Sequence, residues 1–111
     1  MQSLAREIRE ITTDEVRVVS VSFIGKLDTG ELLTGTPTVT AQTGSGLVLS
    51  QKSVLSEAAT INGVSHVAGQ AVQFKADASA GVAGTWTIDM SCATDNGQTL
   101  FGRVTVTVEA S

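Results

Sequence analysis

The sequence has little of most residue types that carry chemistry. Its 111 residues include one cysteine, one histidine, one proline and no tyrosine. One cysteine cannot form an internal disulfide, so nothing implies an oxidising compartment. Cys92 and His66 are too few for a zinc site unless folding brings carboxylates to them. We expect no metal and no cofactor.

Charged residues are also scarce, and the balance among them is acidic. They make up 16% of the chain, against about 25% in typical soluble domains, and the formal net charge is −4. Binding nucleic acid without regard to sequence needs clustered lysine and arginine, so this composition argues against that class. No apolar run approaches the ~20 residues of a membrane span, and the first ten residues lack the apolar stretch of a signal peptide. We expect synthesis in a cytosol, and neither nucleic acid nor membrane as a partner.

No catalytic arrangement stands out either. His66 lies between valines in Val64-Ser65-His66-Val67, which is typical of a strand or loop histidine rather than a general base. No pair of carboxylates stands out for acid–base chemistry. Residues 46–53 space glycine, lysine and serine like a phosphate-binding loop, but Gln51 occupies the second glycine position. We predict a protein that is not an enzyme and has no catalytic residues.

The sequence does contain repeated alternation of apolar and polar residues. Alternation with period two predicts an antiparallel sheet with one buried and one solvated face. Trp86 is expected to anchor the core, and Cys92 continues the same inward stripe, so its thiol should be buried and unreactive. The clear runs are 19–23, 72–76, 86–92 and 104–108, and weaker strands are expected at 38–41, 46–49 and 52–61.

Turn residues separate these runs. Asp95-Asn96-Gly97 between two alternating runs is the clearest hairpin signal, and 28–30, 43–46 and 62–63 are further turns. About seven short strands at regular spacing predict an all-β fold, an immunoglobulin-like antiparallel β-sandwich over residues 14–111. A small barrel is the alternative.

The first 13 residues differ in kind and are predicted to form a short N-terminal helical or extended arm. Leu4, Ile8 and Ile11 recur at helical spacing, with Ser3 as a candidate N-cap. So short a helix is marginal in water, so it must pack on its own domain or become ordered on a partner. Both alternatives stay open. Leu4, Ile8 and Ile11 are the candidate partner contacts.

Three stretches carry a recognisable order of residues. Residues 27–39 read LDTGELLTGTPTV, residues 81–88 read GVAGTWTI, and residues 94–100 read TDNGQTL. In this order they resemble a family of small bacteriophage structural proteins, the fiber-tail adaptors. The resemblance spans residues 16–109, although Trp86 stands where the family more often has tyrosine.

The resemblance implies a non-enzymatic part of a virion, made in the host cytoplasm and present in several copies. Its partners would be other phage structural proteins of the tail, fiber, spike or capsid. A tail adaptor that links the tail to a fiber or spike is the leading hypothesis. A capsid decoration (cement) protein that stabilises the head lattice is the nearest alternative. A carbohydrate- or host-binding module is a third, and it predicts exposed aromatic side chains.

Overall fold

The chain folds into strands joined by turns. The computed structural model describes residues 5–12, 15–61 and 63–109, and of residues 5–12 the backbone alone. These residues form nine strands and no helix. The strands are β1 (Ala5–Thr12), β2 (Val16–Ser22), β3 (Leu33–Ala41), β4 (Val48–Val54), β5 (Ala59–Ile61), β6 (Val64–His66), β7 (Ala71–Asp77), β8 (Gly84–Thr94) and β9 (Thr99–Glu109).

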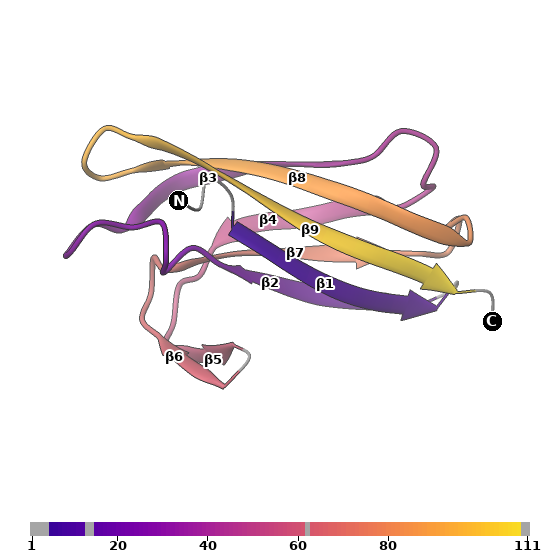
Figure 1. Ribbon diagram of the computed structural model, residues 1–111, viewed down its shortest axis with the longest axis horizontal. Helices are drawn as coiled ribbons and strands as arrows, with labels where there is room; N and C mark the ends of the chain where they lie inside the picture. The colour runs from indigo at the N-terminus through magenta and orange to yellow at the C-terminus, as the bar shows by residue number, and fades with distance from the viewer. Residues whose placement is uncertain (1–4, 13–14, 62, 110–111) are drawn as a thin grey trace.

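Seven of the strands form two sheets that pack face to face (Figure 1). One sheet has the order β1-β9-β8-β3 and the other the order β2-β7-β4, while β5 and β6 form a separate hairpin. Neighbours pair antiparallel, except that β1 runs parallel to β9. The predicted all-β antiparallel sandwich of about seven strands is confirmed, and the barrel alternative is wrong because the two sheets stay separate.

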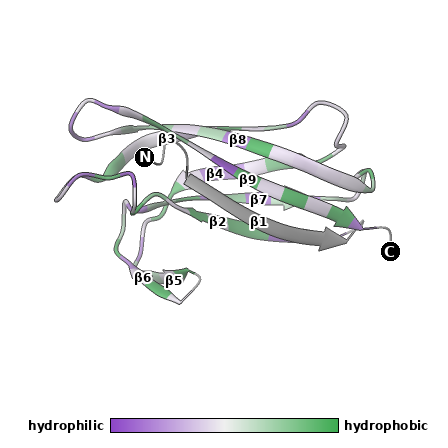
Figure 2. Ribbon diagram, in the orientation of Figure 1, coloured by the Kyte–Doolittle hydropathy of each residue, from purple (hydrophilic) through white to green (hydrophobic). Residues whose placement is uncertain are grey.

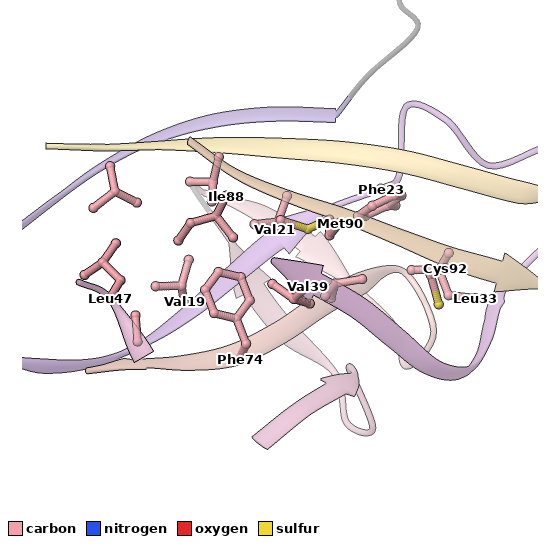
Figure 3. Close-up of a cluster of buried hydrophobic side chains, with 14 of the residues drawn as sticks. Val19, Val21, Phe23, Leu33, Val39, Leu47, Phe74, Ile88, Met90 and Cys92 are labelled. Carbon is pink, nitrogen blue, oxygen red and sulfur yellow. The ribbon is translucent and has the colours of Figure 1, made fainter. Parts of the chain in front are cut away.

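The core lies between the two sheets and follows the predicted alternation. Figure 2 shows apolar and polar residues alternating along β8 and β9. Most of the apolar residues of these two strands are buried. Figure 3 shows Val21, Phe23 and Met90 close together in this core. The predicted inward positions of β2, β7 and β9 are all buried: Val19, Val21, Phe23, Val72, Phe74, Ala76, Val104, Val106 and Val108.

A glycine in the middle of β9 makes room for the largest buried ring. Gly102 lies opposite Met90 of β8, and Phe23 follows the end of β2 in the other sheet. A Cβ atom at position 102 would lie 2.7 Å from Cζ of Phe23, whose side chain is fully buried. The missing side chain of Gly102 therefore sets how closely the two sheets approach at this point.

Residues 5–12 of the N-terminal segment form a strand, so the helical interpretation of these residues is wrong and the extended one holds. Residues Ala5–Thr12 pair with β9 from Gly102 to Glu109. A helix this short has little stability of its own, whereas pairing satisfies the backbone groups along one edge of an 11-residue strand. The pairing also joins this segment to the chain's own sandwich.

The two sides of the sandwich differ in how regular their edge strands are. On one side, β3 has a register shift between Thr34 and Thr38 that contains Pro37. Beside it, β4 has a bulge in which Gln51 adopts a φ of 52°. On the other side, β1 and β2 pair with their neighbours without a register shift. Bulges and proline block the addition of further strands, so the β1–β2 side has the more regular edges.

The weakly alternating stretch between residues 46 and 66 is where predicted strands are wrong. The expected strands at 46–49 and 52–61 are instead one bulged strand, β4, followed by a break at Leu55 and the short strand β5. β6 had not been predicted as a strand. The loss of alternation at the bulge explains the error, because one extra residue reverses the phase of the pattern.

Candidate interaction surfaces

Two of the three stretches that resemble the phage family, residues 27–39 and 94–100, meet at one end of the sandwich, around Glu31. Its side chain is only 5% exposed, and Thr94 donates a hydrogen bond of 2.6 Å to Oε2. Gln98 donates through Nε2 to the same oxygen at 2.9 Å and to Oδ2 of Asp28 at 3.0 Å. The backbone N–H of Asp28 donates to Oε1 of Glu31. Residues of the first and third stretches therefore depend on one another for their hydrogen bonds.

These hydrogen bonds also set the charge state of the cluster. The backbone N–H of Asp28, with the hydroxyl of Thr94 and the amide of Gln98, lowers the pKa of Glu31 against the opposing effect of burial. A hollow of about 290 Å³ lies beside it, lined by residues of the 28–31 and 95–96 turns. Within the described ranges, no group of three or more His, Cys, Asp or Glu side chains could hold a metal ion. The hydrogen bonds of this cluster join the 28–31 turn to the 94–98 turn.

The remaining stretch, residues 81–88, fixes the opposite end of β8. The indole Nε1 of Trp86 donates to the carbonyl oxygen of Val82 at 2.7 Å, and the ring lies against Gly44 and Gly84. The N–H of Val82 donates to the carbonyl oxygen of Ser45. Trp86 packs against the core but is half-buried, so it closes one end of the core rather than filling its centre.

His66 and Ser22 form the one serine–histidine contact that the described side chains present. Their Oγ and Nε2 atoms are 2.6 Å apart, and Nδ1 lies 2.8 Å from the carbonyl oxygen of Val64. Because a carbonyl oxygen only accepts, Nδ1 carries a proton and donates to Val64. His66 is only 3% exposed. The contact ties the β5–β6 hairpin to the end of β2.

Cys92 behaves as the sequence predicts with respect to burial. Its side chain lies in the core, and burial raises the pKa of the thiol. The thiol donates to the carbonyl oxygen of Thr34. Burial therefore favours the protonated form of the sulfur.

The outer face of the β3–β8–β9 sheet contains an exposed aromatic ring that sequence reasoning missed. Phe101 is 54% exposed and lies opposite Ser91, which lies opposite Thr38. The signal was present, because Phe101 is out of phase with the inward run of Val104, Val106 and Val108. A shallow hollow of about 160 Å³ adjoins the ring.

The outer face of the β2–β7–β4 sheet contains exposed valines at one end. Val16 and Val48 both pair with Asp77, and Val18 pairs with Lys75. All three valines are about half or more exposed. A separate hollow of about 210 Å³ lies beside Val18 and the Gln51 bulge.

The three candidate partner contacts all lie in the N-terminal segment. Leu4 lies outside the described residues. Ile8 and Ile11 lie on β1, where their backbones pair with Thr105 and Val108 of β9. Among the residues that the structure describes, no helix is long and apolar enough to cross a membrane.

Comparison with known proteins gives distant structural similarity only. No family model matches the chain, and no curated protein matches it. The solution structure of amebosin is 14% identical with a TM-score of 0.45, covering 93% of this chain and 98% of that one. A 2,6-sialyltransferase from Photobacterium sp. JT-ISH-224, in complex with CMP and lactose, is 12% identical with a TM-score of 0.45. It matches 99% of this chain but only 19% of its own length, and neither similarity is close enough to bear on function.

Proposed function

We propose that this chain is a non-enzymatic structural protein of a bacteriophage virion, and specifically a tail adaptor that links the tail to a fiber or spike. The observation that carries the proposal is the hydrogen-bond network around Glu31. Each of the three stretches, taken alone, contains residues that are common in turns. Because Glu31, Thr94 and Gln98 bond to one another, the first and third stretches form one interdependent pattern, which is more specific than separate turns.

The order of the strands supports the immunoglobulin-like part of the proposal. In constant-type immunoglobulin sandwiches, strands B, E and D share one sheet, and strands C, F and G share the other. Here β2, β7 and β4 form one sheet, and β3, β8 and β9 are neighbours in the other. Assigning β2 as B, β3 as C, β4 as D, β7 as E, β8 as F and β9 as G reproduces that arrangement.

The proposed mechanism is mechanical attachment through the β1–β2 side of the sandwich. That side has the unbulged edge strands, and β1, which contains Ile8 and Ile11 of the N-terminal segment, belongs to it. An edge strand can pair with a strand of another chain, and summed contacts over several copies give a stable assembly. The bulges of β3 and β4 direct such pairing away from the opposite side.

The first test is the location and copy number of the chain in purified virions, measured by cryo-electron microscopy. Density where the tail meets the fibers, in copies that match the rotational symmetry of the tail, would support the adaptor proposal. Density spread over the head, in many more copies, would instead support the capsid decoration protein. Absence from the particle would overturn both.

The second test concerns the attachment surface. A variant with Leu4, Ile8 and Ile11 all changed to serine should be lost from particles while keeping a folded sandwich by circular dichroism. A matched variant with Val48, Val64 and Val67 changed to serine, three exposed valines outside β1 and β2, should be incorporated normally. If the serine variant of the arm assembles as the natural chain does, the N-terminal segment is not the attachment surface. Loss of the valine variant alone would place the attachment surface away from the β1–β2 side.

A further inference from the structure

Phe101 stands alone as an exposed aromatic ring on a polar sheet face. It lies on the outer face of β9, while its neighbours Leu100 and Gly102 are buried. Leaving a phenylalanine about half exposed forgoes part of the roughly 1.5–3 kcal/mol that full burial of such a side chain contributes. No fold-level role accounts for the ring, because the core beneath it is filled by Phe23 and Met90.

The residues around the ring form two rows across three strands. Thr38, Ser91 and Phe101 pair in one row, and Thr40, Asp89 and Arg103 pair in the next. Strand spacing and rise make this patch about 10 Å by about 7 Å. The hollow beside Phe101 is lined by members of both rows.

The second row supplies paired charges at the surface. Nε of Arg103 donates to Oδ1 of Asp89 at 2.6 Å, and Nη2 lies 3.5 Å from Oδ2. Their side chains remain 40% and 59% exposed. Asp89 therefore holds the guanidinium in place, while both groups keep further hydrogen-bonding positions toward solvent.

We propose that this patch is a carbohydrate-binding site that holds one neutral pyranose ring against Phe101. The C–H bonds of a sugar are polarised by the neighbouring oxygen atoms, so they are attracted to the negative face of an aromatic ring. Adjacent sugar hydroxyls each donate and accept, which matches the fixed acceptors of Asp89 and the donors of Arg103. The hydroxyls of Thr38, Thr40 and Ser91 border the same patch.

Size and charge favour this ligand over others. A hollow of about 160 Å³ is below the roughly 300–1,000 Å³ of drug-sized ligand pockets, and it suits a single ring. The patch covers about 70 Å² by the same strand spacing, far less than the roughly 800 Å² that each partner buries in a stable protein interface. A net charge of −4 disfavours phosphates and acidic sugars. The site stands apart from the proposed role in the virion.

The test is a nuclear magnetic resonance titration of the full chain with the methyl glycosides of glucose, galactose, mannose and N-acetylglucosamine. These four vary the configuration at C2 and C4 and the substituent at C2, so one or more should bind with a dissociation constant in the millimolar range. We expect amide shifts confined to residues 38–40, 89–91 and 101–103. F101A should weaken binding about tenfold or more, F101W should retain it, and D89N should weaken it.

Val18→Ala is the matched control, because Val18 is exposed on the opposite sheet and lies outside the patch. This variant should bind as the natural chain does. The spectrum of each variant also reports folding, and Phe101 can be replaced without opening the core. Absence of shifts on this face with all four glycosides would overturn the proposal. Shifts that persist unchanged in F101A would overturn it as well.

Discussion

At the scale of single residues, Glu31 shows how a buried carboxylate is retained in a small domain. Burial alone would favour its neutral form, but three donors compensate. Two of those donors, Thr94 and Gln98, are more than 60 positions away in the sequence. Glutamate at this position therefore connects the loop before β3 to the β8–β9 hairpin, and acts as a structural link.

This link predicts a dependence of stability on pH. The pKa of Glu31 is below its ordinary value of 4.5 in the folded chain, so the unfolded chain binds the proton more readily. The stabilisation that the Glu31 carboxylate gives is fully present above pH 4.5 and is lost as the pH falls through the lowered pKa. Urea unfolding should show a midpoint that decreases on acidification, and Glu31→Gln should lower the neutral midpoint and reduce the decrease.

Two comparisons make this pH experiment specific. Asp77, whose pKa is lowered by hydrogen bonds from Ser79, contributes in the same direction, so some decrease should persist in Glu31→Gln. Glu57→Gln removes an exposed carboxylate and should leave the curve unchanged. An identical acid dependence in Glu31→Gln and the natural chain would mean that Glu31 does not stabilise the fold through its charge.

Gly102 gives a prediction about packing. In Gly102→Ala, the new methyl group would lie 2.7 Å from Cζ of Phe23, whose side chain is fully buried. Overpacking of this kind costs about 1–3 kcal/mol of unfolding free energy. Gly25→Ala is the control, since a Cβ there has nothing within 4 Å. In the double variant with Phe23→Leu, the two losses should not add, because the smaller side chain relieves the contact. If the two losses of unfolding free energy add, the cost of Gly102→Ala does not come from contact with Phe23.

At the scale of elements, the strands that could be predicted are those with strict alternation. Each of these strands has one face in the core, so apolar and polar residues alternate along it with a period of two; they are β2, β7, β8 and β9. β1 could not be predicted, because its pairing depends on the edge of β9 rather than on its own pattern. β4 could not be placed either, because its bulge interrupts the phase.

The β5–β6 hairpin is an element with its own small core. Ile61 packs with Leu55 and Ala71, separate from the main cluster, and His66 joins the hairpin to Ser22. His66→Ala should therefore release the hairpin locally. Amide exchange across residues 59–66 should become at least about tenfold faster, because losing a buried hydrogen bond costs about 1–3 kcal/mol.

The control for the hairpin is Ser65→Ala, an exposed change on the same strand. It should leave exchange in the hairpin unchanged. In His66→Ala, exchange in β7 and β8 should stay slow. If exchange accelerates equally throughout the sandwich, the hairpin unfolds only with the whole molecule and is not an independent unit.

At the scale of the whole molecule, the candidate surfaces are made by strands far apart in the sequence. The Phe101 patch combines β3, β8 and β9, and the His66–Ser22 contact spans 44 positions. Local patterns predicted which side chains point outward, but not which outward side chains become neighbours. That information lies in the register between strands, which only the folded chain supplies.

The parallel pairing of β1 with β9 has a consequence for how the chain responds to tension. Ala5 lies beside Gly102 and Thr12 beside Glu109, so the start of β1 and the end of β9 lie at opposite ends of the paired segment. Pulling Ala5 and Glu109 apart slides eight paired residues lengthwise past one another, and all their hydrogen bonds must yield together. Handles on the paired Arg6 and Arg103 would instead open them one at a time. Single-molecule pulling should therefore find a higher unfolding force for the first geometry, which would suit a link that holds a fiber against drag.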